Sequence, residues 1–119
     1  MLKKSFDFPD IVKTLDKTHA ATVELGPYNA TKLVLEPGWR WSDCVKPHVG
    51  GDSCQATHVG VVAQGSMICV NDDGTEVSVS GGDAYIFAPG HDAWVTSEVP
   101  FVGYEILGSG KDFGAWKKS

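Results

Sequence analysis

Beyond residue 18, the chain alternates between short apolar segments and clusters of glycine, proline or aspartate. Runs of roughly four to eight residues between such turn signals are typical of β-strands. The expected strands cover residues 21–25, 31–36, 57–63, 66–70, 75–80, 84–87, 93–96 and 101–107. About eight strands at this spacing predict an all-β sandwich or closed barrel.

The clearest turn in this pattern is Asp73-Gly74, between the strands expected at 66–70 and 75–80. Glycine accepts the positive φ angle of a tight hairpin turn. Val77 and Val79 alternate with polar residues, which predicts that the second strand has one solvent-facing side.

The N-terminal region has a different pattern. Pro9 suits the first turn of a helix, and the apolar residues within 11–15 fall on one helical face. Ser5 or Asp7 can cap the N-terminus of such a helix. A short helix over residues 9–16 is therefore predicted, as the only helix before the C-terminal region.

Composition narrows the class of protein. With 119 residues, 42% of them hydrophobic and 21% charged, the chain is expected to form one globular domain over residues 1–119. The net charge of -5, with lysine pairs only at Lys3-Lys4 and Lys117-Lys118, disfavours a nucleic-acid partner. No apolar run follows the N-terminal lysines, and no segment approaches the ~20 apolar residues of a membrane helix. A cytoplasmic protein without a membrane partner is expected.

The three cysteines, Cys44, Cys54 and Cys69, cannot all pair within one chain, and free thiols are the default in the cytoplasm. Cys69 lies in an apolar run and is most simply a small core residue. Cys44 lies in a polar segment and receives no role. The polar tail at 111–119 carries two aromatic side chains that can fold onto the barrel or contact a partner chain.

One thiol and two imidazoles lie beside glycine turns in this strand-rich sequence. Cys54 and His58 precede Gly65, and His91 directly follows Gly90. Thiolate sulfur and imidazole nitrogen are common ligands of transition metals. The pattern indicates a metal pocket inside a small β-barrel.

The order of these motifs resembles the cupin superfamily over residues 33–106. A polar cluster, a six-residue spacer to Gly65, a tight hairpin, and then Gly82-Asp83 and Pro89-Gly90 follow the order of the two cupin motifs. Asp-Ser-Cys-Gln-x-x-His and Pro-Gly-His-Asp-Ala-Trp look like the motifs of small bacterial cupin-domain proteins without a firmly assigned reaction. The resemblance implies a double-stranded β-helix (jelly-roll) barrel, with a core at about residues 20–108.

Many cupins hold one divalent metal ion, and the resemblance implies where its ligands fall. Their first motif contains two histidines and a glutamate before a glycine. Anchored on Gly65, it puts His58 at the glutamate position. Cys54 and Asp52 then occupy the positions of the second and the first histidine.

The second motif departs from the family pattern, because its usual histidine falls on Ala93, which cannot bind a metal. His91 lies two residues earlier and can point to the same face of a strand. The predicted metal ligands are therefore Cys54, His58 and His91, with water or a substrate completing the shell. This set suits zinc, iron, nickel or copper better than calcium or magnesium, and its open position is that of a catalytic zinc site.

This hypothesis sets a geometric condition. In a straight strand, the side chains of Cys54 and His58 would stand ~13 Å apart, too far for one ion, so a bend or bulge at residues 55–57 is required. The metal-free alternative is that Cys54 is a small buried hydrophobe, while His58 and His91 form hydrogen bonds inside the barrel.

Further candidates for a pocket around the site are Asp52, His48, Trp94, Tyr85 and Gln64. Asp52 is also explained as a turn residue, Gln64 as a solvated strand residue and His48 as a surface residue. Trp94 and Tyr85 belong to an aromatic set that suits core packing, a dimer interface or an aromatic ligand pocket. Trp39 and Trp41, in the same set, would share one face if their segment is a strand.

Three functional classes follow from these residues. A metalloenzyme would act on a small organic acid or aromatic compound, with Asp52, His48 or Tyr85 handling protons. A ligand-binding or sensor module would use the same pocket without turnover, and a metal-free barrel would have an empty one. Whether the protein is an enzyme is left open. A homodimer is expected, formed through sheet faces or by exchange of the N-terminal segment 6–25.

Overall fold

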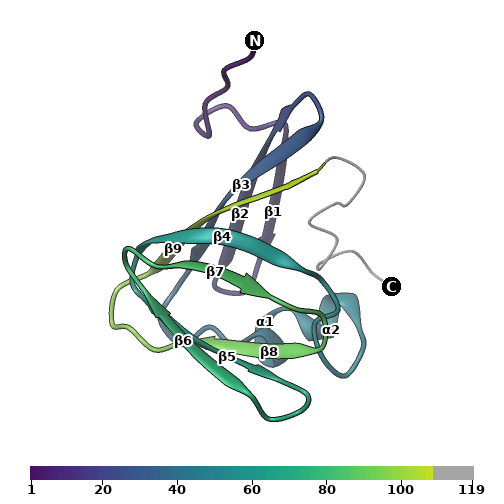
Figure 1. Ribbon diagram of the computed structural model, residues 1–119, viewed down its shortest axis with the longest axis vertical. Helices are drawn as coiled ribbons and strands as arrows, with labels where there is room; N and C mark the ends of the chain where they lie inside the picture. Colours follow the sequence, from purple (N-terminus) through teal and green to yellow (C-terminus); the bar gives the residue numbers. More distant parts are fainter. Residues whose placement is uncertain (109–119) are drawn as a thin grey trace.

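Within residues 1–108, which the structure describes, the computed structural model contains nine β-strands and two short helices (Figure 1). The strands are β1 (Ile11–Leu15), β2 (Thr18–Leu25), β3 (Tyr28–Leu35), β4 (His58–Gln64), β5 (Ser66–Asn71), β6 (Glu76–Ser80), β7 (Ala84–Phe87), β8 (His91–Val95) and β9 (Phe101–Gly108). The helices, α1 (Trp41–Cys44) and α2 (Lys46–Val49), lie between β3 and β4. The predicted role of the tail at 111–119 falls outside the described residues.

The strands form two antiparallel sheets that enclose the core. One has six strands in the order β1-β2-β3-β9-β4-β7, and the other has three in the order β6-β5-β8. Leu35 and Phe101 from the larger sheet meet Met67 and Val95 from the smaller one in the buried interior. The prediction of an all-β fold is confirmed (Figure 1).

The strand pattern beyond residue 18 is also confirmed, because each of the expected strands corresponds to one of β2 to β9. At the predicted tight turn Gly74 has a φ of 89°, and the Thr75 N–H donates to Asp73 Oδ1 at 2.9 Å. Val79 is buried as the alternation predicts, but Val77 is 46% exposed. The cause is position, since β6 is an edge strand of the smaller sheet.

The prediction of a helix over residues 9–16 is wrong. This segment contains β1, which pairs antiparallel with β2 from Ile11↔Thr22 to Leu15↔Thr18. β-Branched residues such as Ile11 and Val12 favour extended backbone. Pairing with β2 therefore outweighs a weak helical periodicity.

Helices occur instead between residues 41 and 49, where the sequence analysis predicted none. Trp41 is the first residue of α1, so it does not share a strand face with Trp39, although both indoles are buried. Cys44 is likewise buried within α1. Neither helix in residues 1–108 has the length and apolar composition that a membrane crossing needs.

Candidate metal centre

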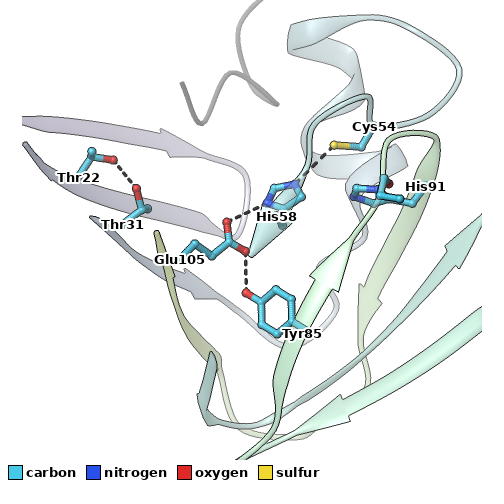
Figure 2. A network of polar contacts seen from close by, with 8 residues as sticks. Thr22, Thr31, Cys54, His58, Tyr85, His91 and Glu105 are labelled. Carbon is cyan, nitrogen blue, oxygen red and sulfur yellow. Dashed lines mark hydrogen bonds and ion pairs between the residues drawn. The ribbon is translucent and has the colours of Figure 1, made fainter. Parts of the chain in front are cut away.

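The structure brings together the three side chains that the sequence singled out. Cys54, His58 and His91 are buried, and their potential ligand atoms all lie within 4.8 Å of one another (Figure 2). The Cys54 Sγ lies 3.7 Å from the His58 Nε2, and the centroids of the two imidazole rings are 5.3 Å apart. In a tetrahedral zinc site, sulfur and nitrogen ligands are about 3.6 Å apart. The donor set and its spacing therefore fit a transition-metal ion.

The backbone explains how residues so close in sequence can converge. Cys54 forms an isolated antiparallel bridge with His91, in which the Cys54 N–H donates to the His91 carbonyl at 2.7 Å. Residues 55–57 lie outside any strand, and β4 starts at His58. No single regular strand therefore joins Cys54 to His58, and their side chains reach each other across this irregular segment.

Both imidazoles are oriented from behind by a hydrogen bond at Nδ1. The Nδ1–H of His91 donates to the Ala88 carbonyl at 2.6 Å, and a carbonyl can only accept, which fixes the position of that proton. The Nδ1–H of His58 donates to Glu105 Oε1 at 2.8 Å. In each ring Nε2 is then the atom that can face an ion, which is the arrangement typical of histidine ligands in metal sites.

Glu105 lies at the centre of this buried network. The residue is 3% exposed, and besides the hydrogen bond from His58 its carboxylate accepts one of 2.6 Å from the Tyr85 hydroxyl (Figure 2). Burial raises the pKa of Tyr85, and the Glu105 carboxylate raises it further. Tyr85 is therefore a permanent donor at physiological pH.

Gly60 makes room for the contact between Tyr85 and Glu105. In the sheet register it lies between them, pairing with Tyr85 on one side and with Glu105 on the other. A Cβ atom at Gly60 would stand 2.9 Å from the Tyr85 hydroxyl and 2.9 Å from the Glu105 Cγ. Only the absence of a side chain lets the two groups meet across β4.

The electrostatics of the group favour the form of cysteine that binds metals. Burial alone would raise the pKa of Cys54, but hydrogen bonds and positive charge from His58 and His91 lower it to about 6. Burial would lower the pKa of His58, yet the Glu105 carboxylate and the Cys54 sulfur raise it to about 10. The pKa of Glu105 is lowered by His58 despite its burial. The Cys54 thiolate is thus present at neutral pH, ready to bind a cation.

A small cavity adjoins the two histidines. It has a volume of about 30 Å³ and is lined by His58, His91, Tyr85 and Glu105 on its polar side. The remaining lining is apolar or aromatic, contributed by Leu33, Leu35, Trp39, Trp41, Met67, Phe87, Ala93 and Phe101. A cavity of this size has room for a ligand of a few atoms, far below the hundreds of Å³ of a drug-sized pocket.

The other sequence candidates lie elsewhere, apart from Tyr85. Asp52 and His48 are exposed, on the loop before Cys54 and on α2. The Gln64 amide donates to the Pro100 carbonyl at 2.9 Å in an exposed position. Trp94 is half-buried and carries the Arg40 guanidinium 4.3 Å above its ring. None of these four residues lines the cavity described above.

Glu105 and Gly60 are the site residues that sequence reasoning missed. Glu105 lies in an ordinary alternating strand, 47 positions from His58. No local motif marks it, because its role arises from the register of β9 against β4. A signal was nevertheless present, since a charged residue at an inward position of a strand calls for a buried partner.

No family model matches this chain, and no curated protein does either. Several solved structures have a similar fold. One is a cupin 2 conserved barrel domain protein from Salinispora arenicola, with 18% identity, a TM-score of 0.54, and coverage of 75% of this chain and 73% of that one. Another is KdgF from Halomonas sp., with 17% identity, a TM-score of 0.57, and coverage of 82% and 84%.

A third similar structure is an uncharacterised double-stranded β-helix protein from Klebsiella pneumoniae, with 16% identity and a TM-score of 0.57. It covers 98% of this chain and 92% of that one. At these identities the likeness concerns the fold. The expectation of a cupin-type, double-stranded β-helix fold is confirmed.

Proposed function

We propose that this cupin-fold protein holds one divalent transition-metal ion through Cys54, His58 and His91 and binds a small molecule beside it. The observation that carries the proposal is the convergence of three buried donor atoms within 4.8 Å. Two of them belong to imidazoles whose Nδ1 atoms are already engaged, so that both Nε2 atoms are available for the ion. Zinc, iron, nickel and copper suit one sulfur and two nitrogen ligands.

The network behind the ligands supports the same proposal. Glu105 holds the His58 ring in place, and Tyr85 in turn holds Glu105. A carboxylate behind a metal-ligating histidine fixes the ring and strengthens its basicity. Such a chain of buried contacts is costly to build, and a metal ligand is a sufficient reason for it.

Ligand binding is the role that the cavity lining favours. Its ionisable residues are His58, His91, Tyr85 and Glu105, and each has a hydrogen-bond partner. Both Glu105 oxygens accept hydrogen bonds, which leaves it poorly suited to remove a proton from a substrate. The cavity of about 30 Å³ admits a small acid better than an aromatic compound.

Metal-assisted catalysis is the second candidate function. It is favoured by the number of protein ligands, because three ligands leave a coordination position open for a reacting molecule. The ion would supply a Lewis acid there. Tyr85 and Glu105 would keep His58 oriented during such a reaction.

Elemental analysis of protein purified without a metal-affinity step tests the metal site. We expect about one equivalent of a transition metal in the wild type, as in other single-ion sites, and loss of that metal in a Cys54→Ala/His58→Ala double variant. Cys69→Ala is the matched control, because Cys69 is a buried cysteine of the same barrel outside the donor group. An unloaded wild type after reconstitution with zinc, iron, nickel and copper would overturn the proposal, as would a double variant that keeps the metal.

A homodimer is also proposed. Val59 and Ile86 face each other across β4 and β7 and are 41% and 69% exposed, and nearby Val61 is 49% exposed. Apolar side chains grouped on one sheet face favour a protein partner. Size-exclusion chromatography with light scattering should give twice the chain mass at micromolar concentration. A monomer would remove the proposal.

A further inference from the structure

Trp41 carries a buried polar atom that the fold does not use. The side chain is 2% exposed and lines the cavity beside His58 and His91. Among the described residues, its indole Nε1 is the buried side-chain nitrogen or oxygen without a hydrogen-bond partner. Buried donors are nearly always satisfied in native proteins, so an unpaired one calls for an explanation.

The neighbouring indole of Trp39 shows that a buried tryptophan N–H in this wall can have a hydrogen-bond partner within the chain. Trp39 lines the same cavity and is 4% exposed, yet its Nε1–H donates to the Thr18 hydroxyl at 2.9 Å. A phenylalanine at position 41 would supply apolar packing without an unpaired donor. The partner of the Trp41 N–H is therefore expected to come from outside the described residues.

The rest of the cavity limits what that partner can be. The polar groups around it are engaged with one another or with the backbone: Tyr85 and His58 with Glu105, and the His91 Nδ1 with Ala88. Trp41 is thus a residue of the cavity lining whose side-chain donor has no partner among the described residues. With about 30 Å³ available, the ligand has only a few atoms.

We propose that Trp41 positions a short anion with acceptor atoms at two ends, such as a small carboxylate, inside the barrel. One end would bind the ion held by Cys54, His58 and His91, and the other would accept the hydrogen bond from the Trp41 N–H. This inference rests on the proposed metal site. It adds the residue that selects the ligand, since an indole N–H can only donate and therefore calls for an acceptor atom.

The first test is anion binding to the zinc-loaded protein, with formate and azide as probes and isothermal titration calorimetry as the readout. We expect Trp41→Phe to keep its zinc, measured by elemental analysis, and to bind both anions about tenfold or more weakly, because a hydrogen bond to a charged acceptor is lost. Trp39→Phe is the matched control. It removes an indole N–H from the same wall and should leave the affinity within about twofold.

The second test reads the indole directly and does not depend on a variant that folds. In wild-type protein with ¹⁵N-labelled tryptophan, the Trp41 N–H resonance should shift downfield on addition of formate, while that of Trp39 should stay in place. Through-space contacts between each indole proton and its neighbours assign the Trp39 and Trp41 signals within the wild-type protein.

The outcomes separate the two proposals. A wild type that takes up none of zinc, iron, nickel and copper overturns the metal site and this inference with it. Normal zinc uptake, with equal anion affinity in wild type and Trp41→Phe or with an indole signal that does not respond, overturns the inference alone. In that case the N–H serves an ordered water or no partner.

Discussion

Two buried polar groups lie side by side on the inner face of the six-stranded sheet and differ in kind (Figure 2). In one, the hydroxyls of Thr22 and Thr31 meet across β2 and β3 at 2.7 Å. In the other, Glu105 joins His58 and Tyr85. The two groups are contiguous, because Thr31 is the register partner of Glu105 in β9.

The difference teaches how to tell a structural polar contact from a functional one. The threonine pair is neutral and closed, since each hydroxyl finds its partner in the other. The Glu105 network is charged and open, because it ends at the Cys54 sulfur and the imidazole nitrogens, which converge on one point. The threonine pair only satisfies buried hydrogen-bonding groups of the sheet. The Glu105 network, in contrast, leaves donor atoms that can bind a ligand.

The largest expected effect comes from breaking the charged group at His58. In the metal-free protein, His58→Ala leaves the Glu105 carboxylate buried without a cation, and the free energy of unfolding should fall by about 3 to 5 kcal/mol. Urea unfolding at pH 7 measures the change. His48→Ala, on the exposed face of α2, is the control and should stay within about 0.5 kcal/mol of the wild type. A loss below about 1 kcal/mol would mean that Glu105 is not a buried anion.

The second prediction concerns pH in the metal-free protein. The raised pKa of His58, about 10, gives stability that is complete below its ordinary 6.5 and is lost as the pH rises toward 10. The lowered pKa of Cys54, about 6, gives stability that is complete above its ordinary 9.0 and is lost as the pH falls through 6. Between pH 6.5 and 9.0 the two slopes oppose each other, so the stability of the wild type should be nearly flat.

Removing the Cys54 thiol should leave the pH dependence of stability that comes from His58 alone. In Cys54→Ala, the free energy of unfolding should decline from pH 6.5 upward, by up to about 1.4 kcal/mol per pH unit while His58 stays protonated in the folded state. Urea unfolding at several pH values measures both proteins, and Cys69→Ala should keep the flat profile. A steep wild-type profile in this range would contradict the pairing of Cys54 with His58.

The third prediction tests whether the contact between Tyr85 and Glu105 depends on the missing side chain at Gly60. Gly60→Ala forces a Cβ between Tyr85 and Glu105 and 2.5 Å from the Tyr104 carbonyl, so it should destabilise the protein by about 1 to 3 kcal/mol. Thermal or urea unfolding measures the effect. Gly81→Ala is the matched control, because a Cβ there meets nothing closer than the Ala63 carbonyl at 3.7 Å. Equal stability of the two variants would mean that β4 shifts freely, against the close approach seen here.

The same comparison explains what the sequence can and cannot predict. Turn residues and alternation identified β2 to β9, because strands and tight turns leave local signals. The order of the motifs also predicted Cys54, His58 and His91 as one group of ligands. This was possible because each lies close in sequence to Gly65 or Gly90. The homodimer and the cytoplasmic location stay predictions.

The features that the sequence did not predict depend on which strands pair with one another. Glu105 and Gly60 acquire their roles from the register between β9 and β4, which no single segment encodes. The helix expected over 9–16 failed for the same reason, because pairing with β2 decides the conformation of β1. The unpaired indole N–H of Trp41 could not be predicted either, because it is recognised only once the positions of all neighbouring groups are known.

The smallest effect is expected at the Thr22–Thr31 pair. It tests whether this pair is independent of the Glu105 network. Thr22→Val should lower the free energy of unfolding by about 1 kcal/mol, because the Thr31 hydroxyl keeps its burial and loses its partner. Thr22→Val/Thr31→Val replaces both hydroxyls with methyl groups of similar shape, so it should return close to the wild type. Urea unfolding of the single and double variants measures the cycle, and metal content should stay at the wild-type level in both. A double variant that is less stable than the single one, or that loses metal, would show that Thr31 supports Glu105 and that the two groups form one network.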